Sequence, residues 1–297
     1  MLLNRRIPFY YIFNKIKYDL ILVLAINFTA YLITYNFQHL MPEMPLAIPA
    51  FIGTSISILL SFKLNQAYDR WWEARKIWGA IVNDSRSFVI QLQNLTTNCD
   101  EKTIKKMAYR QIAWCYSLGQ TLRKSNPLNN LEELLSAEDI DLLKQHENKP
   151  LAILQLNSED LKKLKEKNQL ETFCHIQLDD TIVRLCDSMG RAERIKGTVF
   201  PVTYKLFLHF MIYLFVIALD ISLIDTVWYF EIPLLLILSS IFLLLEKSAR
   251  HMQDPFENMP TDTAMTAIAR TIEINIKQLL SEANVPEPHQ ENKFYLT

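Results

Sequence analysis

Four stretches of this chain are long and apolar enough to cross a lipid bilayer as helices. They lie at about 20–37, 44–62, 204–222 and 226–245, and the first two contain no charged residue. About 20 apolar residues of helix span the hydrocarbon core of a membrane. A short link at 38–43 joins the first pair, and an acidic turn near 220–231 joins the second. The pattern therefore predicts four membrane helices arranged as two hairpins.

The sequence between the second and third spans, from Lys63 to about Lys205, is too polar to cross a membrane. Apolar residues recur there at helical spacing, and Asn126-Pro127 and Lys149-Pro150 mark two breaks. The predicted helices are 69–122 in two or three pieces, 131–145, 159–166 and 170–195, with another at about 261–283. The expected fold class is all-α, with four transmembrane helices and a large polar helical region in each subunit.

The same pattern divides the chain into four parts. They are an N-terminal amphipathic segment with the first two spans (1–62), the polar helices (63–203), the last two spans (204–245), and a polar C-terminal region with a mobile tail (246–297). Lys and Arg are absent from the two links between paired spans. Because cytoplasmic segments are enriched in these residues, we expect both termini and the polar helices in the cytoplasm, beneath the inner membrane of the cell.

Composition fits a protein that is partly embedded in lipid and partly in water. Of its 297 residues 50% are hydrophobic and 21% are charged, the net charge is −1, and the mean hydropathy is +0.05. A net charge near zero argues against nucleic acid as a partner. The cysteines form no closely spaced pair, so we expect no zinc site and no cofactor; they are Cys99, Cys115, Cys174 and Cys186.

The second span carries two different faces when it is drawn as a helix. One face, within an arc of about 140°, mixes small polar with bulky apolar side chains: Thr54, Ser57, Ile58, Ser61, Phe62 and Asn65. Such a face can serve close packing of helices in lipid. It can also form the wall of a narrow pore, in which rings of Ile58 and Phe62 make a constriction that gates by dewetting. The second interpretation requires several subunits around this helix.

Three motifs resemble those of the bestrophin family, particularly its prokaryotic members. The first is FKLNQAYDRWWEARKIWGAIVNDSR at residues 62–86, which is long and specific. The second is Glu193-Arg194-Ile195, followed by Pro201 and Tyr204, and the third is Asp254-Pro255-Phe256. They occur in the family's order and spacing, and the resemblance covers about residues 1 to 280.

The resemblance implies a homopentameric ion channel with one central pore and a hydrophobic neck. The family's neck positions correspond to Thr54, Ile58 and Phe62 here. Thr54 departs from the aliphatic or aromatic residue that is usual in relatives, which predicts a wider and wetter outer end. A second restriction at the cytosolic exit corresponds to Phe173, with Ile176 one turn later.

Animal bestrophins hold calcium in an acidic cluster after the third motif. The corresponding segment here, 257–262, offers few carboxylates, whereas calcium prefers six or more oxygen ligands. We therefore expect no calcium switch, and Asp254 is expected to cap or orient a helix.

The outer segments carry acidic residues and no Lys or Arg: the residues are Glu43, Asp220, Asp225 and Glu231. If these carboxylates line the pore entrance, they raise the local concentration of cations. They can equally be solvated charges of outer loops. The sequence favours small monovalent cations such as sodium as the permeating ions, with chloride as the alternative.

Two other classes of function compete with a channel. A membrane enzyme that binds haem or metal would need paired ligands, but His39, His209 and His251 lie in separate segments. No hydrolase or nucleotide-binding motif is present, so the chain is not expected to be an enzyme. The remaining alternative is a membrane scaffold whose cytosolic helices bind a partner.

Overall fold

The structure is a computed structural model that describes residues 8–37, 44–198, 201–223, 228–289 and 295–296. Regular structure in these residues is helical, apart from isolated bridge positions such as the pair Thr96 and Leu170. The chain forms two compact units. We call Arg5–Arg70 with Val199–Gln253 the membrane unit. The polar unit comprises Met1–Asn4, Trp71–Thr198 and Asp254–Thr297.

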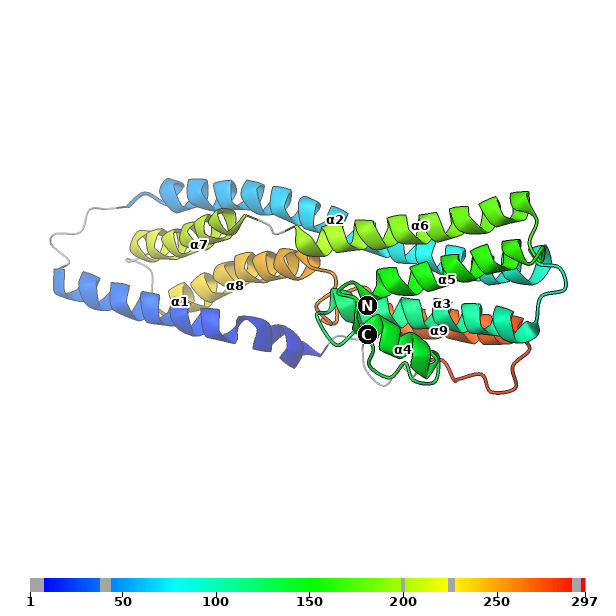
Figure 1. The fold of residues 1–297 in the computed structure, drawn as a ribbon. Coiled ribbons are helices and arrows are strands. Elements are labelled where there is room, and N and C mark those ends of the chain that lie inside the picture. Colours follow the sequence, from blue (N-terminus) through cyan, green and yellow to red (C-terminus); the bar gives the residue numbers. More distant parts are fainter. Residues whose placement is uncertain (1–7, 38–43, 199–200, 224–227, 290–294, 297) are drawn as a thin grey trace. The chain divides into compact units, whose positions relative to one another are not determined.

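The membrane unit contains α1 (Phe9–Phe37), α7 (Val202–Ser222), α8 (Trp228–Gln253) and the first part of α2 (Ala47–Leu95) (Figure 1). Each of these four helices has the length and composition of a membrane span, which confirms the four predicted spans. Leu60 of α2, Leu208 and Ile212 of α7 and Leu243 of α8 form part of a common apolar core. Gly53 permits close packing there, because a Cβ atom on it would lie 3.2 Å from the ring of Phe215.

Two of the helices extend beyond the predicted spans. The first span was expected to start near residue 20, but α1 begins at Phe9 and includes basic residues of the N-terminal segment. The fourth was expected to end at 245, but α8 continues to Gln253. One ion pair joins the two helices near these extensions: Lys247 of α8 pairs with Asp19 of α1. A paired charge no longer ends a membrane helix.

The helix α2 is 49 residues long and passes from apolar to polar sequence without a break. Neither proline nor glycine occurs between Gly53 and Gly79. The stretch predicted as helical at 69–122, in two or three pieces, consists of the last part of α2, which ends at Leu95, and of α3 (Glu101–Leu122), which starts with Asp100 as its N-cap.

The polar unit contains the second part of α2 with α3, α4 (Ala137–Lys144), α5 (Lys149–Glu166), α6 (Thr172–Gly197) and α9 (Met265–Leu279). In Figure 1, α3 lies beside α5 and α9, and α5 lies beside α6. Bulky side chains that are fully buried fill the space between them: Trp78, Phe88, Met107 and Trp114.

Two predicted helices of this unit begin at other residues in the structure. The helix expected at 131–145 is α4, which begins only at Ala137, after its N-cap Ser136, and ends at Lys144. A helix was expected at 159–166 after a break at Lys149-Pro150, but α5 begins at Lys149 itself. Proline has no backbone N–H to lose in the first turn, where that group has no helical partner. The side chain of Asn148 caps this turn by accepting the N–H of Leu151. The proline is therefore a start signal and not a break.

A buried charge cluster connects three helices of the polar unit. Arg110 of α3 is 3% exposed, and its Nε and Nη2 donate to the two carboxylate oxygens of Asp139 at 2.9 and 2.7 Å. Its Nη1 also donates to Asp160 of α5 at 2.5 Å. Burial alone raises the pKa of Asp139, but Arg110 outweighs it and holds that pKa below its usual value. The cluster is therefore ionised at neutral pH.

Candidate functional site: the exposed face of α2

The membrane part of α2 has one buried and one exposed face. Ile56 and Leu60 are 0% and 3% exposed, whereas Ile58 and Phe62 are 54% and 63% exposed. Thr54 is also exposed. The three residues matched to the family's neck therefore share a face that the other helices of the membrane unit leave uncovered. Their role in a pore remains a prediction.

Two hydroxyl groups of this stretch of α2 donate to carbonyl groups of their own helix. Thr54 Oγ1 donates to the carbonyl of Ala50 at 2.9 Å, and Ser57 Oγ donates to the carbonyl of Gly53 at 2.8 Å. Side chains that bond in this way need no partner on another helix. The exposed face of α2 is therefore less polar than its composition indicates.

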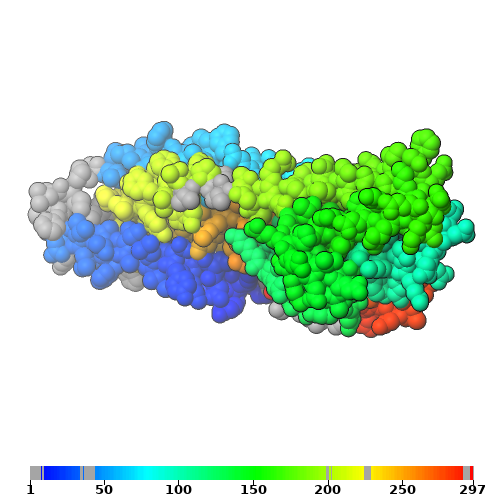
Figure 2. Space-filling view, in the orientation of Figure 1, coloured from blue at the N-terminus to red at the C-terminus, as the bar shows by residue number. Residues whose placement is uncertain are grey.

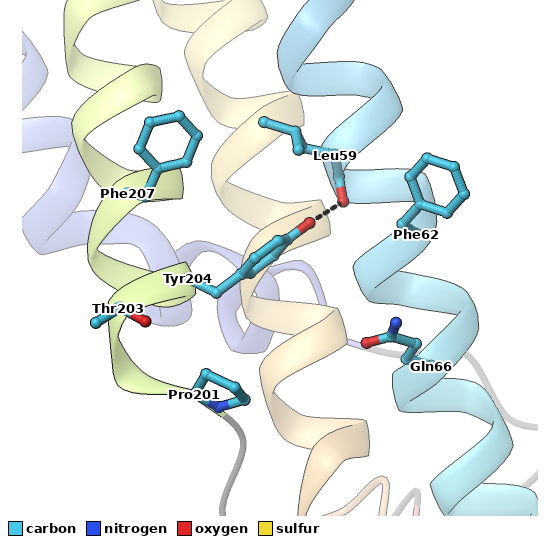
Figure 3. A pocket seen from close by; sticks show the side chains of 7 residues that line it. All are labelled: Leu59, Phe62, Gln66, Pro201, Thr203, Tyr204 and Phe207. Atoms are coloured by element: carbon cyan, nitrogen blue, oxygen red, sulfur yellow. Dashed lines mark hydrogen bonds between the residues drawn. The ribbon is translucent and has the colours of Figure 1, made fainter.

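A cavity of about 630 Å³ lies beside Phe62, between α2 and the start of α7 (Figure 3). Tyr204 of α7 reaches across it, and its hydroxyl donates to the carbonyl of Leu59 at 2.7 Å. The other residues that line the cavity are Phe62 and Gln66 of α2 with Pro201, Thr203 and Phe207. Tyr204, which belongs to the second motif, thus attaches α7 to the turn of α2 that carries Phe62.

Sequence reasoning missed a buried ion pair directly beyond Phe62. Lys63 of α2 donates to Glu246 Oε1 of α8 at 2.9 Å, and the two side chains are 1% and 0% exposed. The sequence carried a signal that could have found it, since each residue directly follows a predicted span. Ionisable side chains at such positions usually pair with one another.

The predicted exit restriction lies on the first turns of α6, in the polar unit. Phe173 and Ile176 are 78% and 58% exposed, although both are large and apolar. Side chains of α6 form part of the surface of this unit (Figure 2). Single exposed apolar side chains are normal on a protein surface and do not by themselves show a contact. Their assignment as a restriction stays a prediction.

The predicted outer charges differ from one another in their surroundings. Asp220 belongs to α7, is 5% exposed, and accepts a hydrogen bond from the side chain of Asn27. Glu231 belongs to α8 and lines a cavity of about 360 Å³ with Asn27, Phe28, Tyr31 and Ile232. Glu43 and Asp225 lie outside the described residues. Asp220 therefore sits within helix packing and not in a solvated turn.

Hydrogen bonds within the polar unit connect the first and second motifs, or residues beside them, to the segment that begins with the third motif. Trp71 of the first donates its Nε1–H to the carbonyl of Thr261 at 2.8 Å. Lys196, directly after the second, pairs with Asp254 of the third at 2.6 Å. Asp254 also accepts the N–H of Phe256, whose ring is fully buried. Asp254 thus orients the segment after α8, close to the role expected for it.

The segment that holds calcium in animal relatives contains one buried carboxylate here. Asp262 is 2% exposed and accepts the N–H of Met259 at 3.0 Å. Burial raises the pKa of Asp262 to about 6. Among the described residues, no group of three or more His, Cys, Asp and Glu side chains could hold a metal ion.

We expect Asp262→Asn to stabilise the polar unit at pH 7.5. The folded-state pKa of Asp262 lies above the unfolded value, so wild-type stability rises as the pH falls through about 6. The variant lacks this dependence and gains about 2 kcal/mol at pH 7.5. Thermal unfolding of the purified protein in detergent with a chelator, at pH 7.5 and pH 5, measures both effects.

The matched control is Asp141→Asn, because that carboxylate is 73% exposed. It should leave the unfolding curve unchanged at both pH values. Replacing the chelator with calcium should also leave the wild-type curve unchanged. A calcium-dependent rise that Asp262→Asn abolishes would contradict the expected absence of a calcium switch. An Asp262→Asn variant that is no more stable than wild type at pH 7.5 in the chelator would contradict the predicted stability gain.

The fold and the exposed face of α2 define a multi-pass helical membrane protein with a large polar unit. Residues 10–278 match the family model described as bacterial/fungal bestrophin protein. The voltage-dependent anion channel-forming protein YneE of Escherichia coli is 30% identical over 275 residues, 93% of this chain and 90% of that protein. A similarly named protein of Ralstonia nicotianae is 26% identical over 250 residues, covering 82% and 80%.

Solved structures agree with these sequence matches. The crystal structure of a bacterial bestrophin homologue from Klebsiella pneumoniae has a TM-score of 0.84 and 26% identity. The match covers 91% of this chain and 100% of that one. This chain belongs to the bacterial and fungal bestrophin family.

Proposed function

We propose that this protein is an ion channel in which five copies surround a central pore lined by α2. Membership of the bestrophin family and the names of the channel-forming relatives support this function. The observation that carries it is the uncovered face of α2, where Thr54, Ile58 and Phe62 follow one another at one-turn spacing. A single copy with four spans has no room for a pore of its own, so the pore requires an oligomer.

Ile58 and Phe62 form the narrow part of the proposed pore. Large apolar side chains that face a channel axis exclude water and oppose ion passage until the ring widens. Thr54 forms the outer end, where its smaller side chain leaves more room. Phe173 and Ile176 of α6 form the second restriction at the cytosolic exit.

We infer that anions permeate this pore. The curated relatives are named for anion channels. The sequence favoured cations because of four outer carboxylates, and that preference is not confirmed. The outer carboxylates that supported the cation preference are also fewer than expected, since Asp220 is buried against Asn27.

The proposed location is the inner membrane of the cell, with both termini in the cytoplasm. The absence of Lys and Arg from the links at 38–43 and 220–231 supports this orientation. The alternatives of a membrane enzyme and a membrane scaffold are less well supported, because the relatives are named for channel formation and not for catalysis or binding.

Electrical recording tests this proposal directly. Purified protein in a planar bilayer between unequal NaCl solutions should pass current that reverses near the chloride equilibrium potential. Reversal near the sodium equilibrium potential would restore the cation preference, and absence of current would reject the channel.

Electron microscopy of the detergent-solubilised protein should show fivefold symmetry, and another symmetry would reject the pentamer.

A further inference from the structure

The turn of α2 that carries Phe62 is held at both of its ends by other helices. At one end, the carbonyl oxygen of Leu59 accepts the hydroxyl of Tyr204 of α7 at 2.7 Å (Figure 3). At the other end, Lys63 donates to Glu246 Oε1 of α8 at 2.9 Å. Leu59 and Lys63 are separated by one helical turn, and Phe62 lies between them. A rotation of this turn about the helix axis would therefore break at least one of the two contacts.

The ion pair is the stronger of these contacts, because water does not compete with it. The side chains of Lys63 and Glu246 are 1% and 0% exposed within a single chain. A side chain that one chain already buries stays buried when further copies assemble around that chain. Opposite charges attract much more strongly in such surroundings than in water. Separating them would leave two charges without compensation in an apolar environment.

Folding stability alone does not explain this pair. Both charges lose their hydration on burial, so two apolar side chains of similar size would stabilise the fold about as well. Glu246 Oε2 makes no hydrogen bond in the described part of the chain, and His209 Nε2 lies 3.7 Å from it. Apolar packing is non-directional, whereas a charge-assisted hydrogen bond fixes both a distance and a direction. The pair therefore gives α2 a defined orientation against α8, which apolar side chains could not supply.

We propose that Lys63 and Glu246 are positioning residues of the pore constriction. Their bond fixes the direction in which the preceding residue, Phe62, projects from α2. In the assembled channel, this direction holds the Phe62 ring toward the axis and keeps the ring of five such side chains closed to water. This inference rests on the proposed channel function, and it adds the two side chains that set the geometry of the constriction without lining it.

Replacing both partners with methionine removes the directional bond and keeps apolar packing. Lys63→Met with Glu246→Met leaves the net charge unchanged. We expect open probability in planar bilayers to rise about fivefold or more, because Phe62 can then turn away from the axis. The conductance of the open channel should keep its wild-type value, since the residues of the neck are all present. The melting temperature in detergent should change by less than about 4 °C, which separates lost positioning from lost folding.

The matched control is the other ion pair of α8. Lys247 pairs with Asp19 of α1 and not with a residue of α2. Lys247→Met with Asp19→Met should therefore leave open probability unchanged. Wild-type open probability in the folded Lys63 and Glu246 double variant would overturn the proposal. An equal rise in the control would overturn it as well, since any ion pair between membrane helices would then have the same effect.

Exchanging the two charges tests the bond separately from the side chains that form it. Lys63→Glu with Glu246→Lys allows an ion pair between the same two helices, so open probability and conductance should both stay at the wild-type values. A changed conductance in the folded exchange variant would mean that the Lys63 charge acts on the permeating ion directly, and it would overturn the positioning role. This variant carries the test if the double methionine variant does not fold.

Hydrogen exchange gives a readout that needs no current. Backbone amides of residues 59–66, followed by mass spectrometry in detergent, should exchange faster in the double methionine variant than in wild type. The control variant should exchange at the wild-type rate. If wild type passes no current, the channel proposal fails, whereas this comparison still shows whether the pair fixes the turn. Equal exchange in all three proteins would overturn the positioning role by itself.

Discussion

Replacing Ile58 and Phe62 together with alanine should raise the ionic current through this protein by about tenfold or more. Both side chains are more than half exposed on α2, and five copies would bring ten of them to the pore axis. Shortening them widens the ring and allows water to enter it, which lowers the barrier to ion passage. A reduction of about 1.4 kcal/mol is sufficient for a tenfold increase in rate. Single-channel recording in planar bilayers gives both conductance and open time.

The matched control for this experiment is a pair of similar residues on another helix. Leu206 and Phe210 of α7 are 63% and 61% exposed, close to the values for the neck pair. Their joint replacement by alanine removes comparable apolar surface and should leave the current unchanged. Equal effects of the two double variants would show that exposed apolar surface matters in general and that α2 has no special position.

Replacing Arg110 with methionine should cost about 3–5 kcal/mol of folding stability. The substitution keeps most of the side-chain volume but leaves Asp139 without its bidentate partner and Asp160 without a 2.5 Å hydrogen bond. An unpaired buried carboxylate must either stay charged without compensation or take up a proton. Chemical unfolding of the purified protein in detergent, followed by tryptophan fluorescence, measures the loss.

An exposed arginine on α6 provides the control. Arg184 also pairs with two carboxylates, those of Asp84 and Asp180, but its side chain is 44% exposed. Arg184→Met should cost less than about 1 kcal/mol, as is usual for ion pairs in water. A comparable loss in both variants would mean that burial does not set the strength of the Arg110 cluster.

The membrane helices could be predicted from the sequence because few structures other than a membrane span contain such long uninterrupted apolar runs. Their ends could not, since a helix end depends on partners in other helices. Lys247 continues α8 because Asp19 of α1 neutralises it, and these residues are far apart in the sequence. The start of α5 was missed for a local reason, because Pro150 can begin a helix as well as end one.

Part of the candidate site could likewise be predicted from the sequence, and part could not. Helical periodicity alone grouped Thr54, Ile58 and Phe62 on one face, because the pattern lies within a single helix. Their assignment to a neck came from the family resemblance and not from the pattern. The pair of Lys63 and Glu246 joins residues 183 positions apart, which periodicity within one segment cannot detect.

The hydrogen bond from Thr54 to Ala50 has a consequence for how an ion would be dehydrated. The hydroxyl hydrogen is committed to the helix, so Thr54 offers a methyl group and an oxygen lone pair to its surroundings. An anion needs hydrogen-bond donors to replace the water that it sheds. In the proposed pore, a ring of Thr54 side chains would supply none, so an anion would pass this level with its hydration shell intact and begin to lose it only at Ile58.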